Sequence, residues 1–310
     1  MMKKLLSWWA DGPVAAGVLL SVAVVLAFAP DHFLPMLARA FLVQWAVAFG
    51  LIAVWNLPQR RWWTGGASML ALALTLWPTM DPVEQEVPLE GPDVLRVAQM
   101  NLLQPNDDHA EVLEEALATG ADVISFQEVS PEWAQVLKVN LKSAYPFHRS
   151  MPGTNCYGIA LFSKIPFEQV EVKQLCRRPM VEAMVRTPNG LIRLFCVHAT
   201  SPGNYTCFRE RNEQLDMLAT LINSSSIPTI LIGDLNTVGW DKALARLCNR
   251  TGLREHSKST GATWPSIAGM ALIPLDHVLV TRQLSVSSLD SFRISGSDHR
   301  GLVSTIQARI

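Results

Sequence analysis

Polar side chains stand repeatedly at the ends of short apolar runs in the latter part of this 310-residue chain. Asn101 ends the run VLRVAQMN, for example, and Glu128 follows VISFQ. Carboxylate and amide oxygens are ligands that hard cations such as Mg²⁺ prefer, and a histidine held by a carboxylate can move a proton. One such residue alone is usually solvated or structural, so the prediction of a catalytic metal site depends on the whole set. The set is Asn101, Glu128, His198, Asp234, Asn236, Asp276, Asp298 and His299.

The elements that must position these residues alternate between strand and helix. Short apolar runs predict strands, at 94–101, 122–126, 157–163, 229–232, 277–281 and 302–308. Apolar residues at helical spacing predict helices, at 108–119, 131–141 and 209–223. The runs 180–186 and 191–197 flank Thr187-Pro188-Asn189-Gly190, which predicts a hairpin. Strands mixed with helices and a hairpin indicate an α/β sandwich built on mixed sheets.

Seven short motifs, six of which contain the polar residues of this set, lie along this part of the chain. They are Gln99-Met100-Asn101, Gln127-Glu128-Val129, GIALFSK at 158–164, Val197-His198, Gly233-Asp234-Leu235-Asn236, Leu275-Asp276-His277 and Ser297-Asp298-His299. In order and spacing they resemble the endonuclease/exonuclease/phosphatase superfamily of metal-dependent phosphohydrolases. That superfamily includes DNase I-like nucleases, inositol-phosphate 5-phosphatases and neutral sphingomyelinases. The resemblance covers roughly residues 94–310 and implies a DNase I-like four-layer α/β sandwich, two packed mixed β-sheets flanked by helices.

The resemblance implies a metal site and its ion. Glu128 matches the principal carboxylate ligand of Mg²⁺ (or Mn²⁺), and Asn101 and Asp298 match groups around that metal. Phosphoryl transfer places negative charge on the non-bridging oxygens, and a hard cation held by oxygen ligands stabilises that charge. The sequence therefore predicts a metal-dependent phosphoric ester hydrolase.

The resemblance also implies catalytic roles. Asp234 and Asn236 match the pair that positions the attacking water and holds the phosphate, and His198 matches a residue that contacts the phosphate. His299 matches the histidine over the scissile phosphate, and Asp276 matches the carboxylate that orients it. The general base stays open between Asp234 and the Asp276–His299 pair.

Two neighbouring features are interpreted without the resemblance. His277 directly follows Asp276, so in a strand it should point to the opposite face, and we interpret it as structural. Arg177-Arg178 is either a solvated pair or a contact on the phosphate side of the site.

Residues 1–80 differ in composition from the rest of the chain. They hold seven of the ten tryptophans and a net charge of +3, whereas residues 81–310 have a net charge of −4. The stretches 14–29, 40–57 and 62–80 contain no charged residue, and a membrane-crossing helix needs about 20 mostly apolar residues. We therefore expect three transmembrane helices in residues 1–80, an acidic proline-containing linker at 81–93 and the enzyme domain at 94–310. The alternatives are a cleaved signal peptide for the first stretch and buried helices of a soluble protein for all three.

The basic residues predict the orientation of these helices. Lys3 and Lys4 precede the first stretch, and Arg60 and Arg61 separate the second from the third. The positive-inside rule places these four residues in the cytoplasm. Three crossings then place the enzyme domain on the periplasmic or extracellular side of a bacterial inner membrane. An oxidising compartment permits disulfides among the five cysteines, although five unpaired cysteines are the alternative.

These observations together predict an anchored enzyme that acts on a phosphorylated lipid. A three-helix anchor before such a domain is similar to the teicoplanin-resistance membrane phosphatases, which are thought to act on polyprenyl pyrophosphate. The alternatives are a sphingomyelinase-like lipid phosphodiesterase, a surface endonuclease or exonuclease, and a non-catalytic binding module. The acidic balance of residues 81–310 argues against duplex nucleic acid as a partner, because such binding needs neutralised phosphates. The oligomeric state is left open.

Overall fold

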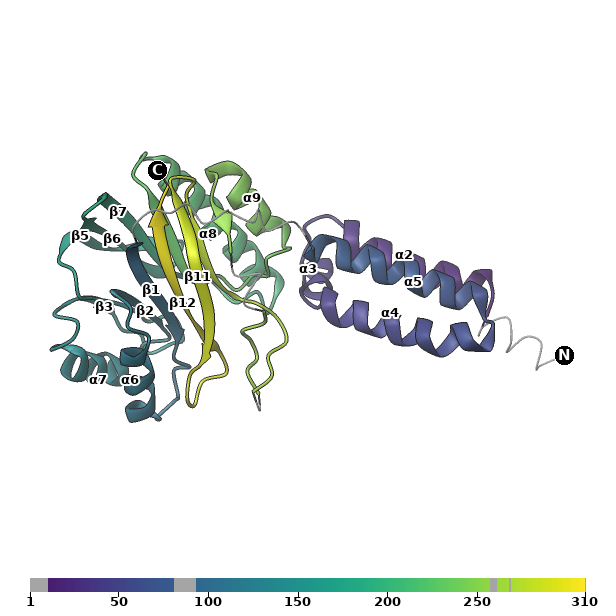
Figure 1. Ribbon diagram of the computed structural model, residues 1–310, viewed down its shortest axis with the longest axis horizontal. Helices are drawn as coiled ribbons and strands as arrows, with labels where there is room; N and C mark the ends of the chain where they lie inside the picture. The colour runs from purple at the N-terminus through teal and green to yellow at the C-terminus, as the bar shows by residue number, and fades with distance from the viewer. Residues whose placement is uncertain (1–10, 81–92, 257–260, 268, 310) are drawn as a thin grey trace. The chain divides into compact units, whose positions relative to one another are not determined.

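The computed structural model describes residues 11–80, 93–256, 261–267 and 269–309. The chain divides into two compact units, which are described separately. The first consists of N-terminal helices and the second contains two β-sheets (Figure 1). The predicted linker at 81–93 lies, except for the backbone of Asp93, outside the described residues.

The N-terminal unit contains four described α-helices. They are α2 (Pro13–Phe28), α3 (Phe33–Ala40), α4 (Leu42–Asn56) and α5 (Trp62–Leu76). Pro13 suits the start of α2 because the first helical residue has no intrahelical partner for its N–H. Helix α5 packs against both α2 and α4 around Ala23, Leu42 and Ala71. Helix α3 lies between the first two predicted stretches, 14–29 and 40–57, where no helix was predicted.

The three predicted transmembrane helices form as helices, but they are short. Among the described residues, one helical segment, Leu42–Gln59, is long and apolar enough to cross a membrane. A second span would require α2 and α3, bent by 101° at their junction, to act together. Helix α5 (Trp62–Leu76) is apolar but is not among the candidate spans. Length and composition therefore support one span, or two at most, where the sequence predicted three.

Two six-stranded mixed sheets form the second unit. The first has the strand order β11-β12-β1-β2-β4-β3. Its strands are β1 (Asp93–Asn101), β2 (Val123–Gln127), β3 (Phe147–Met151), β4 (Ile159–Ser163), β11 (Leu284–Arg293) and β12 (Arg300–Ala308). The second has the order β5-β6-β7-β8-β10-β9. Its strands are β5 (Phe167–Leu175), β6 (Arg178–Thr187), β7 (Gly190–His198), β8 (Thr229–Asp234), β9 (Arg254–Glu255) and β10 (Asp276–Val280).

Helices flank the two sheets. Helices α6 (His109–Ala118) and α7 (Pro131–Leu141) share one apolar core with the first sheet, and α8 (Tyr205–Asn223) and α9 (Lys242–Thr251) share another with the second. A third core, drawn from both sheets, lies between them. Figure 1 shows the two pairs of helices on opposite sides of the sheets. The predicted class of mixed sheets flanked by helices is confirmed.

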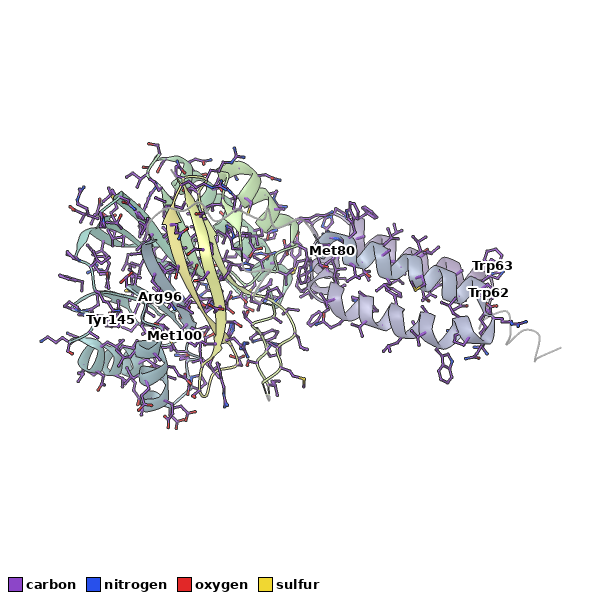
Figure 2. The ribbon with its side chains drawn as sticks, in the orientation of Figure 1. Trp62, Trp63, Met80, Arg96, Met100 and Tyr145 are labelled. Carbon is purple, nitrogen blue, oxygen red and sulfur yellow. The ribbon has the colours of Figure 1, made fainter. Side chains whose placement is uncertain are left out.

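Long polar side chains connect the elements of the first sheet. Arg96 on β1 donates to the carbonyl oxygen of Thr119 after α6 and to the hydroxyl oxygen of Thr305 on β12, at 2.8 and 3.0 Å. The hydroxyl of Tyr145, behind α7, donates to the carbonyl oxygen of Ala121 at 2.9 Å. Figure 2 labels Arg96 and Tyr145 in this unit. These bonds satisfy polar groups that would otherwise be buried without partners.

Candidate active site

The predicted site residues gather at one edge of the two sheets. The pairs β1–β2 and β7–β8 are parallel, with Asn101 opposite Gln127 and His198 opposite Asp234, so their carboxyl ends meet at this edge. Strands β10 and β12 run antiparallel to β8 and β1, which places their first residues at the same edge, with Asp276 opposite Asp234. Loops that follow strand ends on a rigid scaffold are where binding residues concentrate.

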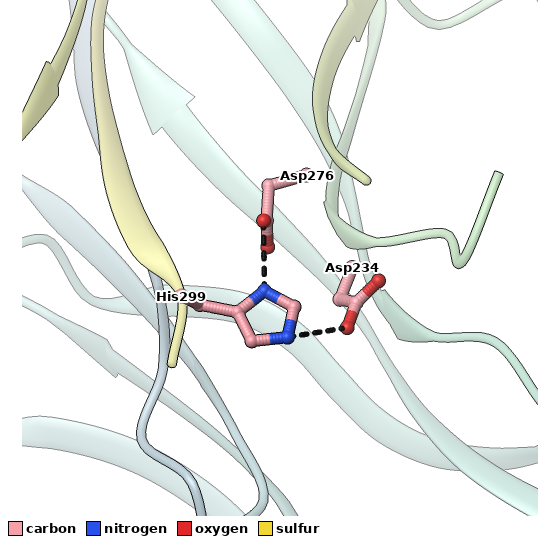
Figure 3. Close-up of side chains that lie close together, drawn as sticks. All are labelled: Asp234, Asp276 and His299. Atoms are coloured by element: carbon pink, nitrogen blue, oxygen red, sulfur yellow. Dashed lines mark hydrogen bonds and ion pairs between the residues drawn. The ribbon is translucent and has the colours of Figure 1, made fainter. Parts of the chain in front are cut away.

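A short chain of buried groups occupies the centre of this edge. The Nδ1 atom of His299 lies 2.9 Å from Oδ2 of Asp276, and its Nε2 atom lies 3.7 Å from Oδ2 of Asp234. Figure 3 shows the imidazole of His299 between the two carboxylates. Ligand atoms of the three residues all lie within 4.8 Å of one another, so this group could hold a divalent metal ion. The sequence assigned these residues to catalysis and not to the metal.

Three side-chain nitrogen atoms surround the Oδ2 atom of Asp234. Besides His299, the amide of Asn101 donates to it at 3.1 Å, and Nε2 of His198 lies 3.5 Å away. The backbone N–H of Asn236 donates to the other oxygen, Oδ1, at 2.8 Å. Both oxygens of this carboxylate are therefore held in place by residues that the sequence selected.

Burial and charge set the protonation of these groups. Burial acts to lower the pKa of His299, but the charges of Asp276 and Asp234 outweigh it and raise the pKa to about 10. Burial, opposed by the charge of His299, raises the pKa of Asp234 to about 7. Burial, followed by the charge of His299, lowers the pKa of His198 to about 3. A charged His299 and a neutral His198 therefore adjoin the same carboxylate.

Glu128, Asn101 and Asp298 form the second part of the site. The Asn101 amide and the backbone N–H of Gln104 donate to the Glu128 carboxylate at 3.3 and 2.9 Å. Burial raises the pKa of Glu128, and the nearby charge of Asp298 acts in the same direction. Within the described residues, the buried Oδ1 atom of Asp298 accepts no hydrogen bond. Two neighbouring carboxylates with an unsatisfied buried oxygen fit a hard cation.

The backbone at this edge adopts conformations that position the side chains. Glu128 and Asn236 have φ values of 60° and 48°, in the left-handed region that L-residues rarely occupy. Such strain concentrates at functional sites. Gly233, with a φ of 138°, lies so close to β7 that a Cβ atom there would be 1.9 Å from the carbonyl oxygen of Val197. Only glycine permits the approach that brings Asp234 beside His198.

An aromatic and basic wall adjoins His198. The guanidinium carbon of Arg178 lies 3.7 Å from the ring centroid of Tyr157, and the Tyr157 ring lies 5.1 Å from that of His198. Arg178 also lies 3.6 Å from the Glu210 carboxylate. Arg178 is thus partly buried beside the site, and it is paired with a carboxylate. It is therefore neither a fully solvated group nor an isolated cation.

Sequence reasoning missed several supporting residues. The amide of Gln99 donates to Asp276 at 2.6 Å and to Gln127 at 2.9 Å. The indole N–H of Trp264 donates to Asp298 at 2.8 Å, and Thr263 accepts from the backbone N–H of Asp276 at 3.3 Å. Gln99 lay within a recognised motif, but Trp264 and Thr263 lie in a stretch with no motif. Only the fold could have identified them.

His277 and the cysteines were interpreted without a catalytic role. His277 is buried beside Glu255, with Nδ1 3.2 Å from the carboxylate, and its Nε2 lies 2.7 Å from the carbonyl oxygen of Thr237. No disulfide forms at four of the cysteines in the described part of the chain. They are Cys156, Cys176, Cys196 and Cys207.

Two packed mixed sheets with carboxylates, amides and histidines at one shared edge define the class of DNase I-like metallohydrolases. The sequence model of the endonuclease/exonuclease/phosphatase family matches residues 97–299, more than half of the chain. The chain therefore belongs to the endonuclease/exonuclease/phosphatase family, and it is a metal-dependent phosphoester hydrolase. No curated protein matches the sequence.

Solved structures share this fold at low sequence identity. An endonuclease/exonuclease/phosphatase from Beutenbergia cavernae is 18% identical, with a TM-score of 0.58 over 70% of this chain and 72% of that chain. D. rerio TDP2, complexed with a single-strand DNA product, is 16% identical, with a TM-score of 0.59 over 70% and 100%. Sphingomyelinase C from Streptomyces griseocarneus is 17% identical, with a TM-score of 0.54 over 69% and 99%. At these identities the likeness extends to the fold and not to the substrate.

Proposed function

We propose that this chain is a membrane-anchored, outward-facing, Mg²⁺-dependent phosphohydrolase that cleaves a phosphoester or pyrophosphate of a lipid. The observation that carries the proposal is the surface of the N-terminal helices. Twenty of the 29 exposed large apolar side chains among the described residues lie between Val14 and Met80. Such a surface is unfavourable in water and favourable in a lipid phase.

The N-terminal helices have further features of membrane segments. Trp62 and Trp63 begin α5 and Met80 lies beyond its other end, and all three side chains are more than half exposed (Figure 2). Tryptophan at a helix end suits the membrane–water interface. The hydroxyls of Ser68 and Thr75 donate to backbone carbonyls one turn earlier in the helix, which satisfies them without water. These features support an anchor even though the spans are short.

In this proposal Glu128, Asn101 and Asp298 hold Mg²⁺ (or Mn²⁺). The ion supplies positive charge that stabilises the negative charge developing on the phosphoryl oxygens. Asn101 bonds to both Glu128 and Asp234, so the same side chain fixes the position of the metal ligands relative to the reacting groups. The buried oxygen of Asp298 provides the remaining acceptor.

The remaining residues act on water and phosphate. Asp234, fixed by the backbone of Asn236, orients the attacking water, and Asn236 and the neutral His198 contact the phosphate oxygens. His299 stays protonated because Asp276 adjoins its Nδ1 atom, so its Nε2 hydrogen can be donated to the phosphate. Electrostatic stabilisation of this kind is commonly the largest contribution to catalysis.

The class of substrate follows from the combination of anchor and site. An anchor holds the site near a bilayer and raises the effective concentration of lipid substrates. The enzyme domain, residues 94–310, has a net charge of only +1, which gives little attraction to polyanionic duplexes. Arg211 is buried and donates to the Asn236 carbonyl, so it is not available to a nucleic acid. We therefore favour a polyprenyl pyrophosphate-like lipid over a sphingomyelin-like phosphodiester, and both over DNA.

A substrate panel tests the proposal. The full chain in detergent micelles, with Mg²⁺, is assayed against polyprenyl pyrophosphate, sphingomyelin, bis-p-nitrophenyl phosphate and plasmid DNA. We expect a lipid substrate to be hydrolysed much faster than DNA is nicked, and an Asp234→Asn variant to lose both lipid and soluble-ester activity. Efficient nicking of plasmid without lipid turnover would contradict the proposal in favour of a surface nuclease.

A further inference from the structure

An apolar hairpin projects from the active-site edge of the enzyme domain. The described residues 263–267 and 269–273 form it, with Trp264 bridged to Ile273 and Ile267 bridged to Met270 in antiparallel fashion. The backbone N–H of Ile267 donates to the carbonyl of Met270 at 2.8 Å, and the reverse bond is 3.0 Å. In Figure 1 this is the yellow-green loop that extends beyond the ends of the strands.

The tip of this hairpin presents large apolar side chains to solvent. Ile267, Met270 and Leu272 are 66%, 71% and 47% exposed. The stretch 261–275 contains no charged residue, although about one residue in five is charged across 81–310. Three of the nine exposed large apolar side chains described in the enzyme domain thus lie within six residues. A concentrated exposed apolar surface marks an interaction site.

The base of the hairpin is fastened to the catalytic residues. The Trp264 indole donates to the Asp298 carboxylate at 2.8 Å, and the backbone N–H of Ser266 donates to the carbonyl of Asp298 at 2.6 Å. The Trp264 ring lies 6.5 Å from that of His299. On the other side of the base, Thr263 accepts from the backbone N–H of Asp276. Whatever surface the tip binds is therefore held close to the reacting groups.

We propose that this hairpin is a lipid-docking loop that inserts Ile267, Met270 and Leu272 into the bilayer surface that contains the substrate. The inference rests on the proposed action at a membrane and deepens it. The occupant is a bilayer because the same chain carries N-terminal helices with exposed apolar side chains, which would tether the enzyme domain to a membrane. A charge-free tip also suits the acyl region, where a charged side chain would be costly. The loop would thereby present a lipid phosphate to Asp298 and His299 directly from the membrane.

Lipid photolabelling tests the docking itself. The full chain is reconstituted in phosphatidylcholine vesicles that contain a diazirine-bearing phosphatidylcholine, irradiated and mapped by peptide mass spectrometry. We expect adducts on residues 261–275 as well as on the N-terminal helices. A triple variant, Ile267→Ser, Met270→Ser and Leu272→Ser, should lose the adducts on 261–275 and keep those on the helices.

A matched variant controls for the loss of exposed apolar side chains in general. Leu117, Val139 and Met217 are also exposed but lie on α6, α7 and α8, away from the hairpin. Their replacement by serine should leave the labelling of 261–275 unchanged. Labelling confined to the N-terminal helices would overturn the proposal. So would a cross-link of the hairpin to a second copy of the chain in place of lipid.

Turnover measurements test the docking of the hairpin separately from the proposed lipid substrate. We expect the triple hairpin variant to lose at least about tenfold in lipid hydrolysis, since interfacial binding scales with buried apolar area, and to lose far less with bis-p-nitrophenyl phosphate. An equal loss on both substrates would mean that the hairpin only supports the site, which would overturn docking. If the hairpin is labelled but the wild type hydrolyses no lipid, the proposed substrate fails and the docking loop stands.

Discussion

At the residue scale, substitution of Glu128 is the most direct test of the proposed metal site. Glu128→Gln keeps the size and the acceptor of the side chain but removes the charge that a hard cation needs. We expect turnover to fall by at least about 100-fold, because several kcal/mol of charge stabilisation are lost and each ~1.4 kcal/mol is tenfold. The thermal midpoint of unfolding should stay the same or rise, because a half-buried carboxylate loses favourable solvation on folding and the neutral amide loses less. The measurement is turnover across a Mg²⁺ titration, with the exposed Glu114→Gln on α6 as control.

Near-normal turnover of Glu128→Gln at saturating Mg²⁺ would show that Glu128 is not a ligand. The alternative group, Asp234 with Asp276 and His299, would then become the better candidate for the metal.

The contact between Asp276 and His299 makes a second prediction at this scale. Their 2.9 Å separation and shared burial indicate that they act as a unit. Single alanine variants of Asp276 and His299 and the double variant should therefore lose similar amounts of activity, because groups that act together are non-additive. Turnover measured for all four proteins of the cycle checks this. Losses that multiply in the double variant would mean that the two side chains act separately.

At the element scale, the close approach of β7 and β8 depends on Gly233. Gly233→Ala would place a Cβ atom 1.9 Å from the Val197 carbonyl oxygen and force an L-residue to a φ of 138°. We expect the free energy of unfolding to fall by at least about 3 kcal/mol. For a domain of this size, that lowers the thermal midpoint by roughly 10 °C. Gly190→Ala is the matched control, because Gly190 has a φ of 121° but open space around it. Equal losses in the two variants would show that strain alone, and not the contact between strands, explains the glycine.

The second sheet contains a buried ion network that makes stability depend on pH. Glu182 on β6 lies 2.6 Å from both Lys173 on β5 and Arg193 on β7. Burial acts to raise the pKa of Glu182, but these two cations outweigh it and hold the pKa below its usual value. A group whose pKa is depressed on folding stabilises the protein above its unfolded pKa, and that stability is lost as the pH falls through the folded pKa.

Glu182→Gln should therefore lower the free energy of unfolding by about 3 kcal/mol at pH 7, as expected when one partner is removed from a buried ion pair. The difference from wild type should narrow below about pH 4, where carboxylates begin to protonate. Thermal midpoints of both proteins between pH 3 and 7 measure this difference. Glu168→Gln, which breaks the exposed pair with Arg186, should cost well under 1 kcal/mol. A constant difference between wild type and Glu182→Gln across the pH range would contradict the assignment.

At the scale of the whole molecule, the proposed anchor predicts a topology. Lys3, Lys4, Arg60 and Arg61 flank the N-terminal helices, and no basic residue lies between 62 and 95. The positive-inside rule then places the enzyme domain outside the cytoplasm. An alkaline phosphatase fused after Ile310 should be active, and a green fluorescent protein fused there should be dark. The same reporters fused after Gln59 serve as the reverse control, and a fluorescent fusion after Ile310 would contradict the outward orientation.

The sequence by itself determined where the chemistry lies. A strand buried on both faces must be apolar, so a polar residue such as Asn101 or Asp234 stands out at the point where the apolar run ends. The same periodicity predicted α7 at 131–141 and most of the central strands within a few residues. Strands β3, β5, β9 and β11 and helix α9 were missed, because β3, β5 and β11 alternate with many polar residues, β9 has two residues, and α9 buries only Ala243, Leu244 and Leu247.

Only the tertiary structure decided which of these groups meet. Asp276 reaches His299 and Trp264 reaches Asp298 because the register of β10 and β12 brings their first residues to one edge, and register is set by packing between distant segments. The exposure of Ile267 and Met270 likewise follows from where the 263–273 hairpin leaves the sheets. Local composition selects the residues and the type of element, but the free energy that joins remote segments comes from cores that exist only in the folded chain.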